Sequence, residues 1–292
     1  MKQQVFTRAA DTSAMVATVA MSSLPALAME STTFAGDSPE TEPVVSVRVD
    51  DSDPKDGVCT GTAIAEHWVI TARHCTDMAR KPGGSVRTGQ GDSQAVYQVD
   101  RVEVAPRGDI ALMHTVEPMR LSHFAEVAAE APSGEVNIYG WSSDGSGGST
   151  QLPSAKGKVE GESELSLYDA PVAAKVTLAD GARIQPGDSG GAIFADGKVA
   201  GIMSAGLFED PDNPTEEEMQ SNSAVAVAPV ADQAEWIRSV AGEQEPESTA
   251  AGGNAPSAGA ASGGSTEWLR YAALGLGVLA LLAAGFWALR RH

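Results

Sequence analysis

Three short segments, widely spaced along the chain, carry the residue types that nucleophilic hydrolysis requires. They read Thr71-Ala72-Arg73-His74-Cys75, Gly108-Asp109-Ile110-Ala111-Leu112 and Gly187-Asp188-Ser189-Gly190-Gly191. This chemistry needs a nucleophile, a base that takes its proton and a carboxylate that orients the base, and Ser189, His74 and Asp109 supply one each. Glycines around Ser189 allow the unusual backbone angles of a tight turn and leave space for a substrate. The chain must therefore fold so that these segments meet.

The order of these segments, and the sequence around them, resembles the chymotrypsin/trypsin family of serine proteases. Further matching segments are Cys59-Thr60-Gly61-Thr62-Ala63-Ile64, His67-Trp68-Val69-Ile70, Gly140-Trp141, Gly201-Ile202-Met203-Ser204-Ala205-Gly206 and Trp236-Ile237. The resemblance covers the domain predicted over residues 43–242. It implies an all-β fold of two antiparallel six-stranded β-barrels, with the site in the crevice between them and a C-terminal helix.

The middle of the chain also favours an all-β fold when it is read without the family. Short runs rich in Val, Ile and Thr lie at residues 44–49, 68–70, 96–99, 110–113, 136–139 and 199–203, bounded by Gly, Pro, Asp and Ser. Such runs are typical of strands in an antiparallel barrel or a sandwich, and the pattern does not distinguish the two. Residues 231–241 place Trp236, Ile237 and Val240 on one face, which predicts a helix.

The resemblance implies a role for each residue of the site. His74 acts first as general base and then as general acid, Asp109 fixes the imidazole tautomer, and Ser189 forms an acyl-enzyme. The amides of Gly187 and Ser189 form the oxyanion hole. Ser204 supports the triad by a hydrogen bond to Asp109.

A second supporting residue is Asp188. In the family, the aspartate before the serine pairs with an amino terminus that is created by a cut after a basic residue. No Lys or Arg lies between Arg8 and Arg48, so this chain offers no such cut before its core. One alternative is a different cut near Thr33-Phe34-Ala35-Gly36, and the other is that Arg183 is the partner of Asp188.

Two arginines depart from the family pattern. Arg73 adds a positive charge directly before His74, where the animal enzymes have Ala. Arg183 stands where trypsin carries the aspartate that selects Lys and Arg substrates. The opposite wall of the substrate pocket is predicted to consist of Ser204, Ala205, Gly206 and Val225. We therefore expect cleavage after small or medium apolar residues, with an acidic preference set by Arg183 as the alternative.

Both ends of the chain are predicted to lie outside the domain. Residues 1–28 have a basic start, an apolar middle and the ending Ala26-Leu27-Ala28, which predicts an export signal that is cleaved after Ala28. Retention of this segment as an anchor is the alternative. Residues 29–42 form an N-terminal segment that further processing could shorten. Residues 243–267 are dominated by Gly, Ala, Ser and Glu without an aromatic residue, which predicts a disordered linker.

Residues 268–292 are predicted to be a separate transmembrane helix with a basic tail. Tyr271 to Leu289 has no charged residue, and a helix of this length spans about 28 Å, close to the hydrocarbon thickness of a bilayer. The following Arg290 and Arg291 belong in the cytoplasm by the positive-inside tendency. This predicts a bacterial cell-surface protein with an extracellular domain and a short cytoplasmic C-terminus. A Gram-positive sorting signal is similar, but its Leu-Pro-x-Thr-Gly motif is missing.

The chain has two cysteines, Cys59 and Cys75. In an exported domain the redox compartment favours a disulfide between them. Closing a loop of this size contributes roughly 3 kcal/mol in the chain-entropy model, and it would tie the histidine segment to the neighbouring strand. Two reduced, buried cysteines are the alternative.

Acidic residues outnumber basic ones, and the formal net charge is −19 at pH 7. This argues against nucleic acid as a partner. The acidic run over residues 208–218 is interpreted as a solvated loop rather than a calcium site, because it lacks regular ligand spacing. The sequence contains no coenzyme motif and no metal-ligand constellation, so we expect neither a cofactor nor a metal.

Taken together, these features predict a monomeric serine endopeptidase that acts on a polypeptide substrate at the outer face of a membrane. Two alternatives stay open. One is a catalytically silent module that uses the protease fold for binding, against which the complete set of His74, Asp109 and Ser189 argues. The other is an esterase that uses the same three residues.

Overall fold

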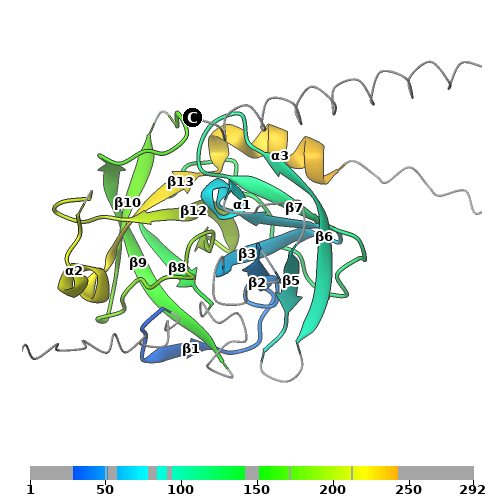
Figure 1. Ribbon diagram of the computed structural model, residues 1–292, viewed down its shortest axis with the longest axis horizontal. Helices are drawn as coiled ribbons and strands as arrows, with labels where there is room; N and C mark the ends of the chain where they lie inside the picture. Colours follow the sequence, from blue (N-terminus) through cyan, green and yellow to red (C-terminus); the bar gives the residue numbers. More distant parts are fainter. Residues whose placement is uncertain are drawn as a thin grey trace, which may run out of the picture. The chain divides into compact units, whose positions relative to one another are not determined.

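The computed structural model describes residues 29–49, 51, 58–77, 84–90, 94–141, 151–170, 172–211 and 213–242 (Figure 1). The chain divides into a unit of residues 1–244 and a unit of residues 245–292, and all described residues belong to the first. The predicted export signal, linker and membrane segment all lie outside the described residues. Within the described part, no helix is long and apolar enough to cross a membrane.

The first half of the domain is a closed barrel of six strands. In their order around the barrel they are β2 (Val44–Arg48), β3 (Val58–Ala65), β4 (Trp68–Thr71), β7 (Ala111–Thr115), β6 (Ala95–Val104) and β5 (Ser85–Thr88). All neighbours pair antiparallel. Every residue of β2, β4 and β7 is buried. Because successive side chains of a strand point to opposite faces, both faces of these strands are covered.

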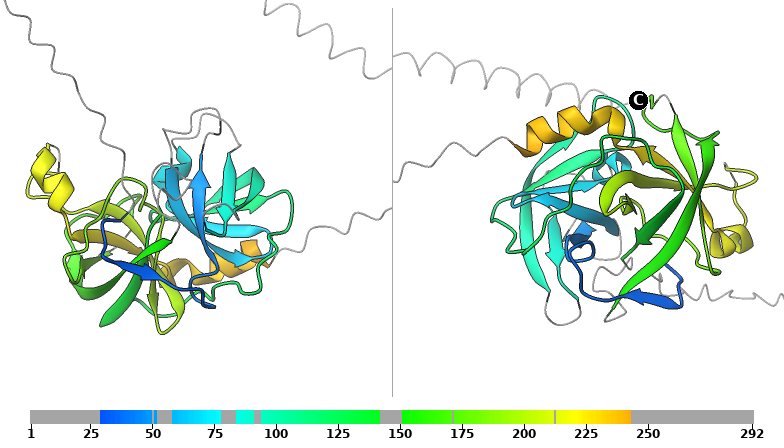
Figure 2. Two further views of the ribbon diagram at one scale, coloured as in Figure 1. Left: turned by 90° about the horizontal axis from the view of Figure 1, so that it is seen from below. Right: turned by 180° about the vertical axis from the view of Figure 1, so that it is seen from behind.

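The second half contains another ring of six antiparallel strands. In ring order they are β8 (Glu135–Tyr139), β9 (Leu152–Ser163), β10 (Ala173–Leu178), β13 (Ala224–Pro229), β12 (Lys198–Gly206) and β11 (Ala192–Ala195), and β11 pairs back with β8. The prediction of two six-stranded antiparallel barrels is confirmed. The long strand β9 also binds β1 (Thr33–Ala35), which runs along the outside of this half (Figure 2). The strand β1 was not predicted from the sequence.

The predicted C-terminal helix is present as α3 (Ala234–Ala241), which follows the 3-10 turn η2 (Ala231–Gln233). Ile237 of α3 is buried, so the helix is fixed by packing on its apolar face. A short helix α1 (Arg73–Asp77) follows β4 and carries His74.

The predicted acidic loop folds in part into a helix, α2 (Glu216–Ser221). Thr215 Oγ1 accepts the backbone N–H of Glu218 at 3.2 Å, and Glu218 Oε2 accepts that of Thr215 at 2.8 Å. This reciprocal cap satisfies backbone donors that a helix leaves free at its first turn, and acidic side chains there interact favourably with the helix dipole. Glu218 therefore stabilises the start of α2.

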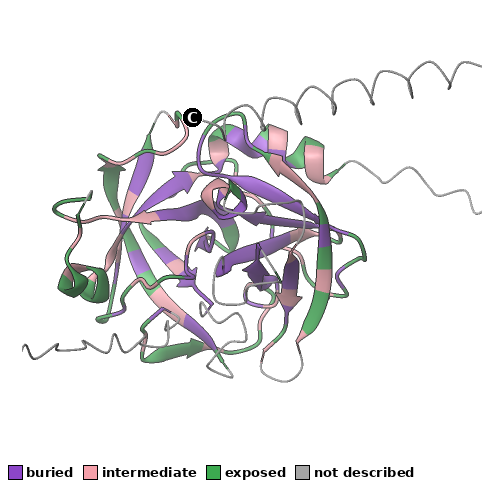
Figure 3. Ribbon diagram, in the orientation of Figure 1, coloured by how far each residue is buried: buried purple, intermediate pink, exposed green. Residues whose placement is uncertain are grey.

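Buried residues lie inside the barrels and in the region where the halves meet (Figure 3). One hydrophobic cluster contains residues of both halves, among them Leu112, Trp141 and Phe194. A second cluster around Met203 and Val227 belongs to the second half and includes Met29. The shared cluster holds the barrels against each other, so a site that draws on both can have a fixed geometry.

Candidate active site

His74 and Asp109 are brought together by one pair of neighbouring strands. Strands β4 and β7 are antiparallel, and Thr71 at the end of β4 lies opposite Ala111 at the start of β7. The chain leaves β4 into α1, which carries His74, and it enters β7 two residues after Asp109. Both residues therefore emerge at the same end of the first barrel.

The carboxylate of Asp109 holds His74 through two hydrogen bonds, one to its imidazole and one to its backbone. Asp109 Oδ2 lies 2.7 Å from His74 Nδ1, and Oδ1 accepts the backbone N–H of His74 at 2.8 Å. Asp109 is 1% exposed, whereas the His74 side chain is 26% exposed. Because the carboxylate can only accept, Nδ1 carries the proton and Nε2 of the neutral ring carries the lone pair. This is the state of a histidine that can take a proton.

Ser189 lies in a tight turn at the start of β11, where glycine is required. Gly187 and Gly190 have φ angles of 105° and 82°, in the region that side chains disfavour. A Cβ added to Gly190 would lie 2.1 Å from Thr71 Oγ1 and 2.4 Å from the carbonyl oxygen of Thr60. Gly190 thus lets the turn of the second half touch the first barrel, next to the strand that leads to His74.

Thr60 of β3 anchors this turn, a role that was not predicted from the sequence. Its backbone N–H donates to the carbonyl of Ser189 at 2.8 Å. Its hydroxyl donates to the carbonyl of Gly187 at 2.8 Å and accepts the N–H of Trp141 at 2.9 Å. Thr60 is fully buried. The only hint in the sequence is a polar residue directly after Cys59 in a buried strand.

The disulfide between Cys59 and Cys75 is present, as predicted. Both cysteines are buried, and the bond ties β3 to α1. Thr60, which holds the turn of Ser189, directly follows Cys59, and His74 directly precedes Cys75. The disulfide therefore links the positions next to both residues. Among the described residues, however, no hydrogen bond joins Ser189 Oγ to His74. Hydrogen bonds of this kind often form only when a substrate is bound.

The supporting roles predicted for Ser204 and Arg183 are not seen. The Ser204 hydroxyl donates to the carbonyl of Ile202 at 3.3 Å and makes no hydrogen bond to Asp109 among the described residues. The guanidinium of Arg183 lies 3.5 Å from the Glu30 carboxylate and does not pair with Asp188. Ser204 instead contacts Ile202 on its own strand, and Arg183 contacts Glu30 of the N-terminal segment.

Asp188 contacts Met29 instead. Its Oδ1 accepts the backbone N–H of Met29 at 3.1 Å, and its Oδ2 accepts that of Gln185 at 2.8 Å. Burial raises the pKa of this fully buried carboxyl to about 8, although these two hydrogen bonds act in the opposite direction. The segment near residues 33–36, predicted as a cut site, forms β1 and is paired with β9.

The predicted wall of the substrate pocket is assembled from two paired strands. Ser204, Ala205 and Gly206 end β12, and Gly206 lies opposite Val225 of β13. A Cβ added to Gly206 would lie 2.6 Å from Asn222 Nδ2 and 2.7 Å from Phe208 Cζ. The side chains of Asn222 and Phe208, which the sequence analysis did not single out, therefore occupy the space beside Gly206.

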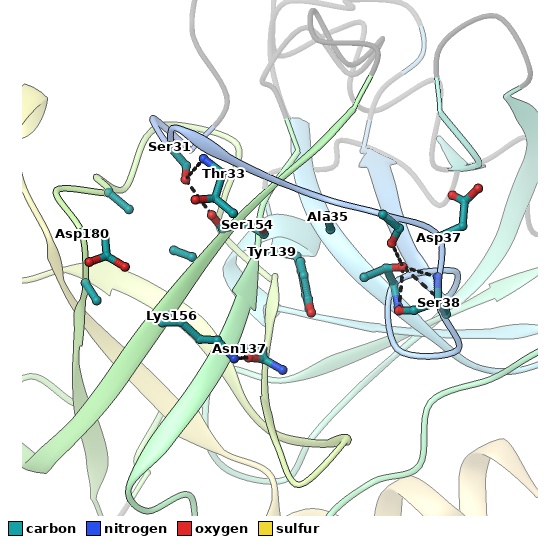
Figure 4. A pocket seen from close by; sticks show the side chains of 15 residues that line it. Ser31, Thr33, Ala35, Asp37, Ser38, Asn137, Tyr139, Ser154, Lys156 and Asp180 are labelled. Carbon is teal, nitrogen blue, oxygen red and sulfur yellow. Dashed lines mark hydrogen bonds between the residues drawn. The ribbon is translucent and has the colours of Figure 1, made fainter.

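A cavity of about 500 Å³ elsewhere in the domain is lined by residues of β1, β8 and β9 (Figure 4). None of its lining residues belongs to the predicted site. Several of its polar groups pair with one another or with the nearby Glu40. Tyr139 and Asn137 both donate to Glu40 Oε1, and Lys156 donates to Asn137 Oδ1. We assign no ligand to this cavity.

Comparisons with known proteins agree with this geometry. A protein of Corynebacterium glutamicum that is named as a peptidase is 27% identical over 252 residues, which cover 78% of this chain and 78% of that protein. The structure of neuropsin, titled a serine protease expressed in the limbic system of mouse brain, is 21% identical, with a TM-score of 0.51 over 70% of this chain and 96% of neuropsin.

A scabies mite inactivated protease paralogue has the same fold. Its structure is 18% identical, with a TM-score of 0.52 over 72% of this chain and 97% of the paralogue. The fold alone therefore does not decide whether a chain is active. The family model described as Trypsin matches residues 36–237. Since this match covers most of the chain, the protein belongs to the trypsin family of serine proteases.

Proposed function

We propose that this protein is a serine endopeptidase whose catalytic residues are His74, Asp109 and Ser189. The observation that carries the proposal is the His74–Asp109 pair, in which a buried carboxylate holds Nδ1 at 2.7 Å. Such a pair orients the imidazole as a base, and the turn that presents Ser189 lies against Thr71 and Ala72, just before His74 in the chain. A polypeptide is the substrate class of the trypsin family.

The proposed reaction follows from these positions. His74 Nε2 takes the proton of the Ser189 hydroxyl as its oxygen attacks the carbonyl carbon of the substrate, and Asp109 stabilises the imidazolium that results. The amides of Gly187 and Ser189 donate to the oxyanion, each typically worth about 3 kcal/mol of transition-state stabilisation. The amine leaves with the proton from His74, and water then hydrolyses the acyl-enzyme. The side chains of Phe208 and Asn222 fill space beside Gly206, which supports the expected preference for small over large side chains.

The test is labelling of the full-length protein with a fluorophosphonate, which reacts with an activated serine. We expect labelling of the wild type and none of Ser189→Ala or His74→Ala. Absence of labelling in a processed, folded wild type would favour the silent binding module. If the protein labels and turns over esters but no member of a peptide library, the esterase reading is correct and the endopeptidase proposal is wrong.

We also propose that the domain is displayed on the outer face of a membrane, held by residues 268–292 through the linker 243–267. The support is the sequence of both ends of the chain, with an export signal at the start and a basic tail at the end. Protease added to intact cells should digest the domain and leave a short fragment in the membrane fraction. Recovery of the whole protein from the medium would refute the anchor.

We further propose that removal of the export signal creates the mature amino terminus at Met29. Hydrolysis of the Ala28–Met29 bond by the export peptidase adds water across the bond, leaving a carboxylate on Ala28 and an amine on Met29. This amine is predominantly protonated at neutral pH when it faces a carboxylate. Processing during export would then complete the site, and no separate activating protease would be needed.

The support for this terminus is the surroundings of Met29. Met29 is only 2% exposed, and its nitrogen lies 3.1 Å from the fully buried carboxylate of Asp188. Gly140 leaves room for that carboxylate, since a Cβ there would lie 2.0 Å from Asp188 Oδ1. Among the described residues no Lys, Arg or His forms an ion pair with Asp188. An ammonium at Met29 supplies the positive charge that a neutral amide lacks.

Intact-mass analysis and amine acetylation of the folded protein test this terminus without any need for activity. We expect a chain that begins at Met29 and an α-amine that reacts only after unfolding. Asp188→Asn should expose the amine to acetylation, whereas Asp196→Asn, at an exposed turn, should not. A chain that begins elsewhere, or an amine that reacts freely in the folded wild type, would refute the proposal.

A further inference from the structure

The position before His74 carries a charged side chain whose partners lie in both halves of the domain. The Arg73 guanidinium lies over the ring of Tyr168 at 4.4 Å from the ring centre. Its Nε lies 3.7 Å from Asp77 Oδ2, and that same oxygen accepts the hydroxyl of Tyr168 at 2.9 Å. Arg73 and Asp77 belong to α1 of the first half, whereas Tyr168 lies between β9 and β10 of the second.

Tyr168 contacts the segment of Asp109 as well. Its carbonyl accepts the backbone N–H of Gly108 at 2.8 Å. Gly108 is buried, directly precedes Asp109 and has a φ of 85°. One residue of the second half therefore binds the neighbours of both His74 and Asp109, which come from separate segments of the first.

The backbone at Tyr168 is built for this contact. Tyr168 and Asp169 have φ angles of 56° and 55°, a conformation that residues other than glycine rarely adopt. Such a conformation persists where the surrounding contacts hold it in place. Here the turn carries the Tyr168 carbonyl to Gly108 and the Tyr168 ring to Arg73.

The chemistry of the three side chains suits a lasting contact. A guanidinium is attracted to the face of an aromatic ring. Burial, together with the hydrogen bond to the Asp77 carboxylate, raises the pKa of Tyr168 to about 12. The phenol therefore stays protonated and keeps donating at physiological pH. Arg73 departs from the family pattern. Its guanidinium contacts the ring of Tyr168 and the carboxylate of Asp77.

We infer that Tyr168 is a positioning residue of the active site. From the second half it holds the two segments that carry His74 and Asp109, and Arg73 and Asp77 are its partners on α1. The alignment of the base with its carboxylate then depends on the turn between β9 and β10. This inference rests on the proposed function, because it assigns His74 as the base.

The test compares Tyr168→Phe, which keeps the ring but removes the hydroxyl, with Tyr168→Leu, which removes the ring as well. Tyr97→Phe is the matched control, since the Tyr97 oxygen also makes one hydrogen bond, to the N–H of Arg120. The second-order rate of fluorophosphonate labelling of the full-length protein is measured together with thermal unfolding. Because small misplacements of a catalytic group can cost up to about 100-fold in rate, we expect about 3- to 10-fold for Tyr168→Phe and more for Tyr168→Leu.

A merely structural role would lower the unfolding midpoint in step with the rate, so the two are compared directly. We expect midpoint shifts of less than about 4 °C for Tyr168→Phe. The double variant Tyr168→Phe/Asp77→Ala should label no more slowly than the slower single variant, because each single change removes the same hydrogen bond. Multiplicative losses in the double variant, or wild-type rates in both Tyr168 variants, would overturn the inference.

Proton NMR separates this inference from the proposed function. The Nδ1 proton of His74, bonded to Asp109, gives a far-downfield resonance that His74→Ala identifies. We expect Tyr168→Leu to weaken or abolish this resonance through faster exchange with water, and Tyr97→Phe to leave it unchanged. If the wild type does not label, the proposed function fails, and this resonance alone decides: its persistence in Tyr168→Leu refutes the positioning role.

Discussion

Replacing Thr60 by Val should disable the serine turn without touching any catalytic residue. The change keeps the size and the β-branch of the side chain but removes its hydroxyl. That hydroxyl joins the carbonyl of Gly187 to the N–H of Trp141, with distances of 2.8 and 2.9 Å. The site is fully buried. Both groups would therefore lose a partner that water cannot replace.

The cost can be worked out from these two groups. A buried donor or acceptor left without a partner costs about 1–3 kcal/mol, so Thr60→Val should lower the free energy of unfolding by about 2–6 kcal/mol. Thr60→Ser keeps both hydrogen bonds and loses one methyl group, which costs about 1 kcal/mol. The backbone bond from residue 60 to Ser189 is common to both variants. The difference between them isolates the hydroxyl.

Urea unfolding and the rate of fluorophosphonate labelling should be measured for both variants. We expect Thr60→Val to unfold at lower urea and to label slowly even where it is folded, because the Gly187 carbonyl is no longer held. Thr60→Ser should label at a rate close to that of the wild type. The reasoning fails if Val and Ser variants have equal stability, or if Thr60→Val labels as fast as the wild type.

Three further predictions follow from the site. Replacing Cys59 and Cys75 by Ser removes a disulfide between residues that are 16 apart in sequence. The free energy of unfolding should fall by about 3 kcal/mol, and the midpoint of thermal unfolding in calorimetry by about 6–12 °C. An unchanged midpoint would contradict this prediction. Gly190→Ala should abolish labelling, because its Cβ would meet the Thr60 carbonyl oxygen at 2.4 Å with φ at 82°; a labelled variant would show that the turn can shift. In a chain whose signal removal is blocked by Ala28→Leu, Asp188 faces a neutral amide, and its carboxyl keeps its proton in the folded state up to about pH 8. The unfolded carboxyl loses that proton at lower pH, so stability should fall as pH rises from about 4 to about 8, and Asp188→Asn should flatten this dependence in urea titrations.

The parts of the site that sequence could predict are those with a local pattern. His74, Asp109 and Ser189, the proposed catalytic residues, lie in short segments whose neighbours mark them as candidates, and the strand runs around them follow from residue type. The two cysteines could be paired because the chain has no others. For these residues the information lies within a few positions of the residue itself.

The parts that sequence could not predict depend on contacts between distant segments. Met29 meets Asp188 across 159 positions, and Tyr168 meets Asp77 across 91. Neither Met29 nor Tyr168 has neighbours that mark it as functional. Arg183, one of the two alternatives for a partner of Asp188, pairs with Glu30 instead, and Glu30 lies in an N-terminal segment without a recognisable pattern. A tertiary contact decided each of these cases.

The proposed site is divided between the two halves of the domain, with the base and its carboxylate on one and the nucleophile on the other. Two sets of contacts that cross this division lie near the proposed catalytic residues: Thr60 with Gly187 and Ser189, and Tyr168 with Gly108 and Asp77. The two residues act on different reacting groups. Thr60, from the first half, holds the turn of the proposed nucleophile, and Tyr168, from the second half, holds the segments of the proposed base and its carboxylate. Substitutions at Thr60 and Tyr168 should therefore reduce the labelling rate independently, and a double variant should show the product of the two single losses. A double variant no slower than Thr60→Val alone would mean that both residues act through one shared movement of the halves.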